Sequence, residues 1–351
     1  MAYTTINNGS LFMNPKIYTG NGGTQTITDI NFEPDLIVTK GRDLGESPWW
    51  TDKVVGLTKY RYSDGGQPDV TYTTAVTGTN SDGYVLGNLN GFNNNTKTFV
   101  SWNWKAGTAV SGNTGGSGSY KAYSGSVNTT SGFSIIKYQS NGTSGITIPH
   151  HLGAVPKMII FKNIGAAFAW TTYHHSAITA SATNKSYLTL NTTDGVRTNG
   201  SDTTFLGVST TTFTLGTDEG LNKSDNNYIA YCFAEVPGYS KFSSYIGNGN
   251  ADGPFVYTGF KPAFVMTKTI NAADDWQILD NKRNGFNPNL FQLVANSYNV
   301  EQTSGNRADF LSNGFKIRTS GGSWNPSGWA ILYMAFGQSL VGTNNIPNNA
   351  F

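Results

Sequence analysis

The residues with the widest chemical reach in this sequence are four histidines, which occur as the adjacent pairs His150-His151 and His174-His175. Neutral imidazoles bind transition metals and act as general bases. Neighbouring side chains on a strand point to opposite faces, so one pair alone cannot chelate a metal. No Cys, Asp or Glu stands within either motif at a spacing typical of metal ligands. We therefore expect structural or surface histidines, with no metal and no cofactor.

Nucleophiles and acids are also present, but their surroundings do not favour catalysis. Cys232 lies inside an apolar segment, which predicts a small core residue rather than a nucleophile. The serines of 115–119 follow no apolar strand, unlike the serine of a nucleophile elbow. Asp218-Glu219 and Asp274-Asp275 are expected in loops. Glycoside hydrolysis would need two carboxylates about 5–9.5 Å apart across a groove, and no motif in the sequence indicates such a pair.

Tryptophans are the remaining candidates for ligand contact. Aromatic rings on loops can stack on the apolar faces of sugars, while neighbouring amides bond the hydroxyl groups. Three of the tryptophans recur at similar places, which favours a structural role in which each ring fills the core of its own unit. Trp324 has no counterpart and is the better surface candidate. The recurring positions, which stay candidates for receptor binding, are Trp49 (or Trp50), Trp170 and Trp276.

The element that must position these residues is a seven-residue segment that occurs three times. Each copy opens with proline, continues through apolar residues and ends on lysine. Proline suits the first residue of a strand, and the unbroken apolar run fits a strand buried on both faces. Lysine is expected to end the burial by carrying its ammonium to water. The copies run from Pro34 to Lys40, from Pro156 to Lys162 and from Pro262 to Lys268.

Further signals recur around each copy. An Asn-Gly turn precedes it, and a tryptophan, a hairpin signal and an aromatic closing strand follow it. Units of roughly 100 residues with short strands and regular turns are typical of β-sandwiches. The sequence therefore predicts an all-β protein with three tandem β-sandwich repeats of jelly-roll or lectin-like type, the last two packed as a unit. The closing strands are expected at 98–104, 228–234 and 329–336.

The joints between the repeats differ in composition. Residues 108–131 are rich in Gly, Ser and Thr, which predicts a flexible linker that lets the first repeat move or dock separately. The joint 235–241 is short and contains a proline, so the second and third repeats are expected to form one rigid body. The expected order is an N-terminal arm (1–16), repeat 1 (17–107), the linker (108–131), repeat 2 (132–237), repeat 3 (238–340) and a C-terminal tail (341–351).

The composition limits the classes of function. Charged residues make up 13% of the chain and the formal net charge is +2, which gives no field suited to nucleic acid. A single cysteine allows no internal disulfide and fits synthesis in a reducing cytoplasm. The N-terminus has no basic segment followed by an apolar run, and no apolar stretch approaches the roughly 20 residues of a membrane span. We expect neither a signal peptide nor membrane insertion.

Long segments of the sequence, and not only isolated motifs, resemble a known family of domains. The segments 228–242, 245–253, 255–266 and 310–315 resemble an uncharacterised β-rich repeat domain found in fibre- or tail-type structural proteins of tailed, mainly marine, bacteriophages. The segments 1–6, 82–87 and 102–107 resemble it too, so the likeness covers nearly the whole chain. The resemblance implies a place in a virion and brings no catalytic residues with it.

Three functions follow as hypotheses. The first is a virion surface fibre or appendage, not an enzyme, made in the host cytoplasm and released by lysis. Its partners would be further copies of itself in a homotrimer, other virion proteins, and a glycan or protein on the host surface. The second is a capsid decoration or head-fibre protein. The third is a polysaccharide depolymerase, whose acids would have to converge in a groove.

Overall fold

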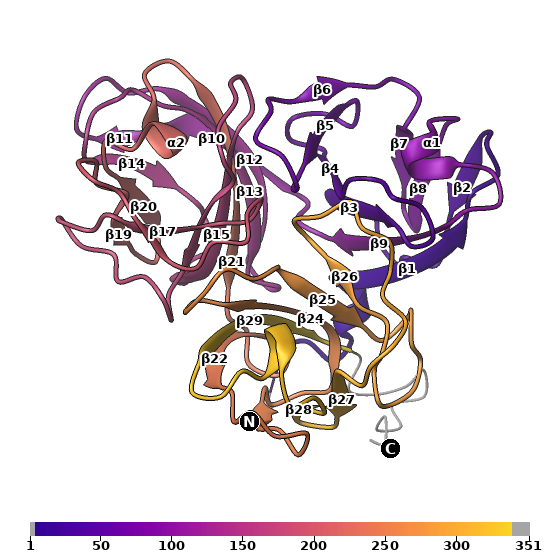
Figure 1. Cartoon of the computed structure of the whole chain (residues 1–351). Coiled ribbons are helices and arrows are strands. Elements are labelled where there is room, and N and C mark those ends of the chain that lie inside the picture. The colour runs from indigo at the N-terminus through magenta and orange to yellow at the C-terminus, as the bar shows by residue number, and fades with distance from the viewer. Residues whose placement is uncertain (1–3, 339–351) are drawn as a thin grey trace.

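The computed structural model describes residues 4–338, and nearly all of its regular structure is antiparallel sheet. The predicted all-β fold with three β-sandwich repeats is confirmed. The sandwiches form three lobes around a common centre, in indigo to purple, magenta to red, and orange to yellow (Figure 1). We name them module 1 (13–104), module 2 (108–234) and module 3 (240–337).

Module 1 follows a short 3-10 helix, η1 (Gly9–Leu11). Its elements are β1 (Met13–Thr19), β2 (Gln25–Ile27), β3 (Leu36–Gly41), β4 (Trp49–Asp52), β5 (Lys59–Tyr62), β6 (Val70–Thr71), β7 (Val76–Asn80), β8 (Gly83–Leu86), α1 (Asn90–Asn93) and β9 (Thr98–Trp104). The larger sheet has the order β1-β9-β3-β4-β5-β6, and the smaller one has the order β2-β8-β7.

Module 2 is the largest of the three. Its elements are β10 (Thr108–Asn113), β11 (Gly115–Gly116), β12 (Ala122–Asn128), β13 (Phe133–Gln139), β14 (Ile146–Pro149), β15 (Pro156–Asn163), β16 (Thr171–His174), β17 (Ser186–Thr189), β18 (Arg197–Thr198), β19 (Phe205–Val208), β20 (Thr212–Leu215), α2 (Glu219–Asn222) and β21 (Asn227–Ala234). The sheets have the orders β10-β12-β13-β21-β15-β16-β17-β18 and β11-β14-β20-β19.

Module 3 repeats the same plan with fewer strands. Its elements are β22 (Ser240–Ile246), β23 (Phe255–Tyr257), β24 (Pro262–Thr269), β25 (Gln277–Asp280), β26 (Leu293–Val294), β27 (Ala308–Leu311), β28 (Gly314–Ile317), η2 (Gly322–Trp324) and β29 (Ala330–Gly337). The sheets have the orders β22-β29-β24-β25-β26 and β23-β28-β27.

The proline-led segments occupy equivalent places in the three modules. Each forms a central strand (β3, β15 or β24) that pairs with the closing strand of its module on one side and with the strand after the recurring loop on the other. The register is also shared: Lys40 lies opposite Val100, Lys162 opposite Ile229 and Lys268 opposite Leu332. The internal repeat read from the sequence is therefore a structural repeat.

The unbroken apolar runs follow from a burial on two sides. Successive side chains of a strand point to opposite faces. On β3, Ile37 packs into the core of module 1, whereas Leu36 and Val38 reach a second core shared by all three modules. On β24, Val265 packs inside module 3 while Met266 reaches the shared core. On β3 and β24, one face thus builds the sandwich of the module and the other face builds the centre of the molecule, whereas on β15 both faces contribute to the one large core.

The prediction of a flexible linker at 108–131 is wrong. Strand β10 pairs with β12 over its whole length, and β12 also pairs with β13, so this segment extends the large sheet of module 2. Gly125 explains why small residues are needed here, since an added Cβ would lie 2.4 Å from the carbonyl oxygen of Ile135. The Gly, Ser and Thr content reflects close strand packing and an exposed face rather than chain freedom.

The first module also does not stand apart from the other two. Its Trp104 ring packs against Phe233 of module 2 and against Phe264 and Phe336 of module 3. The expected pairing of repeats 2 and 3 is therefore part of a larger unit in which all three share one core. The N-terminal arm joins it through Ile6. Residues 1–3 of that arm, and the predicted tail 341–351, lie outside the described residues.

No helix within residues 4–338 combines the length and the apolar character that crossing a membrane requires.

Hydrogen exchange tests the correction at 108–131. Because both edges of β12 are bonded, the amides of Ala122–Asn128 should exchange at least about a hundredfold more slowly than an unstructured chain. Exchange of the native protein, read by mass spectrometry on a peptide that covers β12, is the measurement. Exchange at the unstructured rate would restore the linker interpretation.

Candidate functional site

Three buried lysines close the junctions between the modules. Each is the last residue but one of its central strand, has no exposed surface, and donates from Nζ to two backbone carbonyl oxygens. One acceptor lies in the same module and the other in the preceding module, where module 3 precedes module 1. The contacts are Lys40 with Glu46 (2.5 Å) and Tyr298 (3.0 Å), Lys162 with Phe168 (2.8 Å) and Gly66 (2.9 Å), and Lys268 with Asp274 (2.5 Å) and Thr193 (2.7 Å).

The expectation that these lysines carry their ammonium groups to water is wrong. Burial lowers the pKa of Lys40, Lys162 and Lys268 to about 8 in each case. The carbonyl oxygens replace the water that each group leaves behind, which is the condition for burying a polar group. The lysines therefore work as clamps between modules rather than as the ends of buried strands.

A second equivalent position reaches across each junction in the other direction. Asp52, His174 and Asp280 lie at the same register on β4, β16 and β25, and all three are buried. Each bonds the closing strand of the following module. The contacts are Asp52 Oδ2 with the Tyr231 hydroxyl (2.9 Å), His174 Nε2 with the Tyr333 carbonyl (3.2 Å) and Asp280 Oδ2 with the Trp102 indole N–H (2.9 Å).

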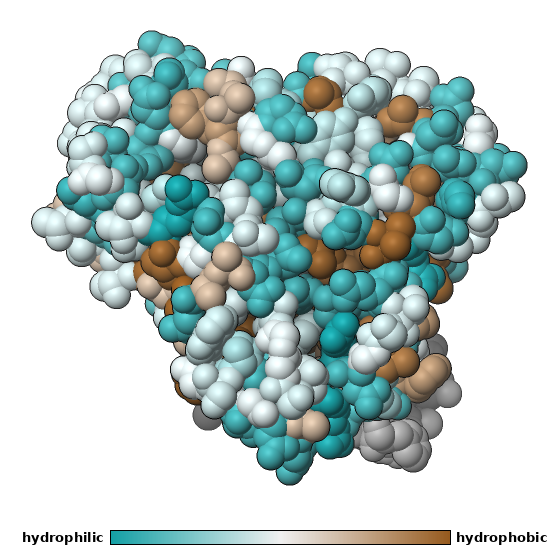
Figure 2. Space-filling view, in the orientation of Figure 1, coloured by the Kyte–Doolittle hydropathy of each residue, from teal (hydrophilic) through white to brown (hydrophobic). Residues whose placement is uncertain are grey.

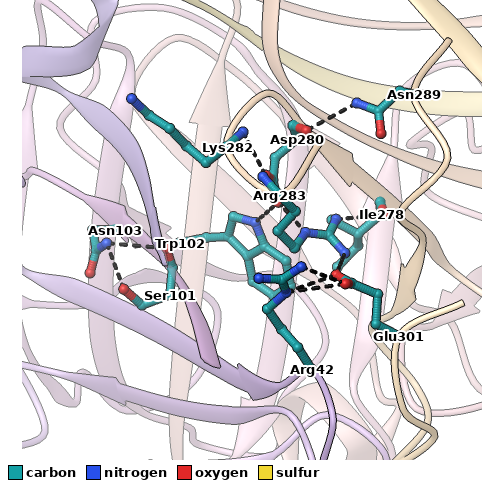
Figure 3. A network of polar contacts seen from close by, with 10 residues as sticks. All are labelled: Arg42, Ser101, Trp102, Asn103, Ile278, Asp280, Lys282, Arg283, Asn289 and Glu301. Atoms are coloured by element: carbon teal, nitrogen blue, oxygen red, sulfur yellow. Dashed lines mark hydrogen bonds and ion pairs between the residues drawn. The ribbon is translucent and has the colours of Figure 1, made fainter. Parts of the chain in front are cut away.

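The junction of modules 3 and 1 holds a network of ion pairs and hydrogen bonds, which Figure 3 shows. Arg283 lies between two carboxylates, with Nε 2.6 Å from Asp280 Oδ2 and Nη1 3.0 Å from Glu301 Oε1. Arg42 of module 1 bonds the other oxygen of Glu301 at 2.7 Å. Burial alone would raise the pKa of Asp280, but the Arg283 guanidinium holds it below its usual value. Both carboxylates are bonded by arginines across or beside the junction, so they suit cohesion between the modules.

The junction of modules 1 and 2 has its own charge cluster. Arg61 bonds Asp52, Asp69 and the Tyr231 hydroxyl, with 2.7 Å between Nη2 and Asp69 Oδ2. Arg61 and Asp52 have no exposed surface. A buried cation with two carboxylates needs such complete bonding, because an unpaired buried charge costs several kcal/mol, on the order of 3–5.

All three recurring tryptophans are buried, and two of them, Trp170 and Trp276, lie at the junctions between modules. The indole N–H of Trp170 donates to the Tyr62 carbonyl of module 1 at 2.8 Å, and that of Trp276 donates to the Thr189 carbonyl of module 2 at 2.9 Å. The Trp170 ring also packs against Trp50 of module 1, so Trp170 joins the two modules. Trp49 does pack inside its own module. By strand register, Pro48 takes the place of Trp170 in module 1.

Trp324 contradicts its assignment as a surface candidate. Its side chain is 1% exposed and packs in the core of module 3. Its indole N–H donates to Gln292 Oε1 at 2.7 Å. Trp324 takes the place of Phe92 in module 1 and of Leu221 in module 2, because a tyrosine hydroxyl donates to the backbone carbonyl of each of these residues. The sequence shows no counterpart because the equivalent core residues are not tryptophans.

Two of the four histidines, His150 and His174, are buried, whereas His151 is exposed. His174 accepts from the Ser176 amide through Nδ1 and donates to Tyr333 through Nε2, so it is a neutral tautomer. Burial lowers the pKa of His174 to about 3 and that of His150 to about 4. Within residues 4–338, no three side chains of His, Cys, Asp or Glu gather as a metal site would need. Cys232 is buried in β21, as expected for a core residue.

A hollow of about 490 Å³ borders the passage from module 1 to module 2 and contains one acid with a shifted pKa. Burial raises the pKa of Asp35, whose oxygens accept from the Ala106 amide (2.9 Å) and the Ser126 hydroxyl (3.1 Å). Asp35 is the one carboxylate among the residues that line this hollow. A glycosidase uses two. Through these two bonds Asp35 of module 1 holds the chain in place just before β10 and contacts β12.

A second surface feature, which the sequence analysis missed, is a groove of about 640 Å³ on module 3. It lies beside the loop 281–292 between β25 and β26 and is lined by asparagine side chains and by Phe286. Phe286 is 71% exposed. The signal was present in the sequence as Asn281-Lys-Arg-Asn-Gly-Phe-Asn-Pro-Asn289, where four amides flank an aromatic ring.

Comparison with known proteins places the chain in a family without assigning it an activity. The model of a family described as a domain of unknown function (DUF7483) matches residues 8–339. No curated protein matches the chain, and no solved structure matches it.

Replacing one clamp should destabilise the fold. Lys162→Met leaves the Gly66 and Phe168 carbonyls without their donor, at about 1–3 kcal/mol each, while removing the cost of burying the ammonium. We expect the free energy of unfolding, measured in urea, to fall by about 2–4 kcal/mol. The exposed Lys282→Met is the control, with a change within about 0.5 kcal/mol. Equal stability of the two variants would show that the clamp contributes nothing.

Acid should weaken the junction at His174. The pKa of His174 is about 3 in the folded chain, compared with the ordinary value of 6.5. Below pH 6.5 the unfolded chain therefore binds a proton at this residue, while the folded chain does not. The free energy of unfolding should fall between pH 6.5 and about pH 4, by up to about 1.4 kcal/mol per pH unit for this group. In His174→Gln, which keeps an N–H donor, the fall should be smaller. Identical pH profiles would contradict this assignment.

Proposed function

This chain belongs to the DUF7483 family, and from its own structure and sequence we propose that it is a structural protein of a bacteriophage virion, carried on a surface fibre or appendage that contacts the host envelope. The observation that carries the proposal is the closed three-module body. Its buried charges bond one module to the next, which makes the molecule a rigid unit suited to bearing load between a particle and a cell.

The outer surface supports the same proposal. The face in Figure 2 is mainly hydrophilic, with scattered apolar residues between polar ones. Large aromatic side chains stand out on loops, among them Tyr120 (69% exposed), Phe286 (71%) and Tyr298 (64%). Exposed aromatics among polar neighbours are typical of surfaces that bind partners. The resemblance of long sequence phrases to phage fibre and tail proteins supports a place on the virion.

A capsid decoration protein is the second candidate, and the cyclic arrangement of the modules favours it. Three equivalent lysines and three equivalent junctions give one chain an approximate threefold shape. Such a shape matches a threefold or local threefold position on an icosahedral shell. The two candidates differ in copy number, because a shell offers many such positions while tail appendages are few.

Particle composition tests the proposal. We expect gradient-purified virions to contain this chain in few copies relative to the major capsid protein, measured by quantitative mass spectrometry. An antibody against the chain should label the tail in electron micrographs. A copy number that approaches that of the capsid protein would favour decoration, and absence from purified virions would refute both virion roles.

A further inference from the structure

The large sheets of the three modules end in strands that are protected to different degrees. An edge strand leaves backbone N–H and C=O groups without a ladder partner, and within residues 4–338 the three large sheets have six such edges. The edge strands β6, β18 and β26 have two residues each and offer little backbone for pairing. The longer edge strands are β1, β10 and β22, with seven, six and seven residues respectively.

Two of these longer edges are blocked. On β1, the residues that face away from β9 include Pro15, which has no N–H, and Thr19, whose carbonyl accepts from a glutamine side chain at 3.0 Å. On β22, the Phe242 amide donates to Glu235 Oε2 at 3.3 Å, and the Phe242 carbonyl accepts from His175 Nε2 at 2.9 Å. A further strand could not pair along either edge without displacing these contacts.

Strand β10 is open. The ladder with β12 uses the backbone groups of alternate residues, and the bond from the Thr114 amide to the Lys121 carbonyl fixes which residues they are. Ala109, Ser111 and Asn113 therefore point their N–H and C=O groups away from β12, where these groups have no partner within residues 4–338. Ala109 and Ser111 also border the hollow of about 490 Å³ described above, so open space lies beside them.

The side chains of β10 do not guard its edge. Five of its six residues are exposed, and Thr108–Asn113 contains neither a charged residue nor a proline. Charges and prolines are the usual means by which an edge strand avoids pairing with another chain. The lysines beside this edge are neutralised by ion pairs, Lys53 with Glu33 at 2.9 Å and Lys121 with Asp225 at 2.5 Å. Both the backbone and the side chains thus favour the addition of a strand.

We propose that β10 is an interface between two copies of this chain, in which the two β10 strands pair antiparallel about Ser111. In this register Ser111 of one copy lies opposite Ser111 of the other, and Ala109 lies opposite Asn113. Each opposing pair exchanges two hydrogen bonds, so every outward group of the three residues gains a partner. No like charges meet, because neither strand carries a charge. The two eight-stranded sheets become one continuous sheet.

The contact is small, which sets its expected strength. One six-residue strand from each copy buries less area than the roughly 1,200–2,000 Å² of a stable interface. Dimers in dilute solution are therefore weak, with a dissociation constant in the micromolar range. Copies held side by side on a larger assembly would pair more firmly, because their effective concentration is high. The inference does not rest on the virion role, and its twofold contact is distinct from the homotrimer considered above.

The test uses the full chain and substitutions at Ser111. Ser111→Pro removes the central outward N–H and costs no bond to β12, since that N–H faces away from β12. Ser111→Lys and Ser111→Asp each place like charges opposite one another across the contact. Ser244→Lys, at an exposed serine of the blocked edge strand β22, is the matched control. Urea unfolding shows whether each variant keeps the wild-type fold.

Sedimentation equilibrium up to millimolar protein measures the association. We expect wild type and Ser244→Lys to dimerise alike. Ser111→Pro should raise the dissociation constant at least about tenfold, because two hydrogen bonds of the dimer are lost. Ser111→Lys and Ser111→Asp should each raise it severalfold. An equimolar mixture of these two charge variants should dimerise at least as well as wild type, since the introduced lysine then faces the introduced aspartate.

Three results would overturn the proposal. The first is a wild type that stays monomeric throughout the concentration range. The second is a Ser111→Pro variant that dimerises as the wild type does. The third is a mixture of Ser111→Lys and Ser111→Asp that associates no better than either variant alone. A wild-type trimer that is unaffected by these substitutions would likewise reject the β10 contact and favour the homotrimer.

Discussion

The interaction on which the rest of the structure depends is the capture of a lysine ammonium by carbonyl oxygens of two modules. A charged group removed from water needs hydrogen-bond partners in the protein that replace the water it loses. For Lys40, Lys162 and Lys268 one substitute lies in the neighbouring module, so each lysine is satisfied only when that neighbour is in place. Cohesion between modules is thereby a condition for burying the central strands, and not a later addition to finished sandwiches.

At the second repeated position, on β4, β16 and β25, different side chains make the contact with the following module. Asp52, His174 and Asp280 each reach the next closing strand, but they meet a hydroxyl, a carbonyl and an indole N–H. A carboxylate accepts and a neutral imidazole donates, so the partner had to differ with the residue. The backbone plan of the repeat is therefore kept while the bonds across each junction are exchanged.

Local patterns predicted the strands well, because periodicity and turn residues act over a few positions. The proline-led runs lie in equivalent places, and Cys232 is buried as expected. Long-range packing was beyond such patterns. The burial of Lys162 depends on Gly66, far away in the chain, and the order of 108–131 depends on pairing with β13. The groove was missed because its asparagines are typical of turns.

Three equivalent junctions arranged head to tail return to their starting point after the third module. An open row of three modules would have two junctions and two unpaired ends. In this chain a third junction joins module 3 to module 1 and closes the ring. The centre of the body repeats the same junction after each third of a turn, whereas the outline does not, since module 2 carries the additional strands β10, β11 and β12 and module 3 carries the loop 281–292. A partner with matching symmetry would therefore meet three similar junctions, and these additions distinguish its three orientations.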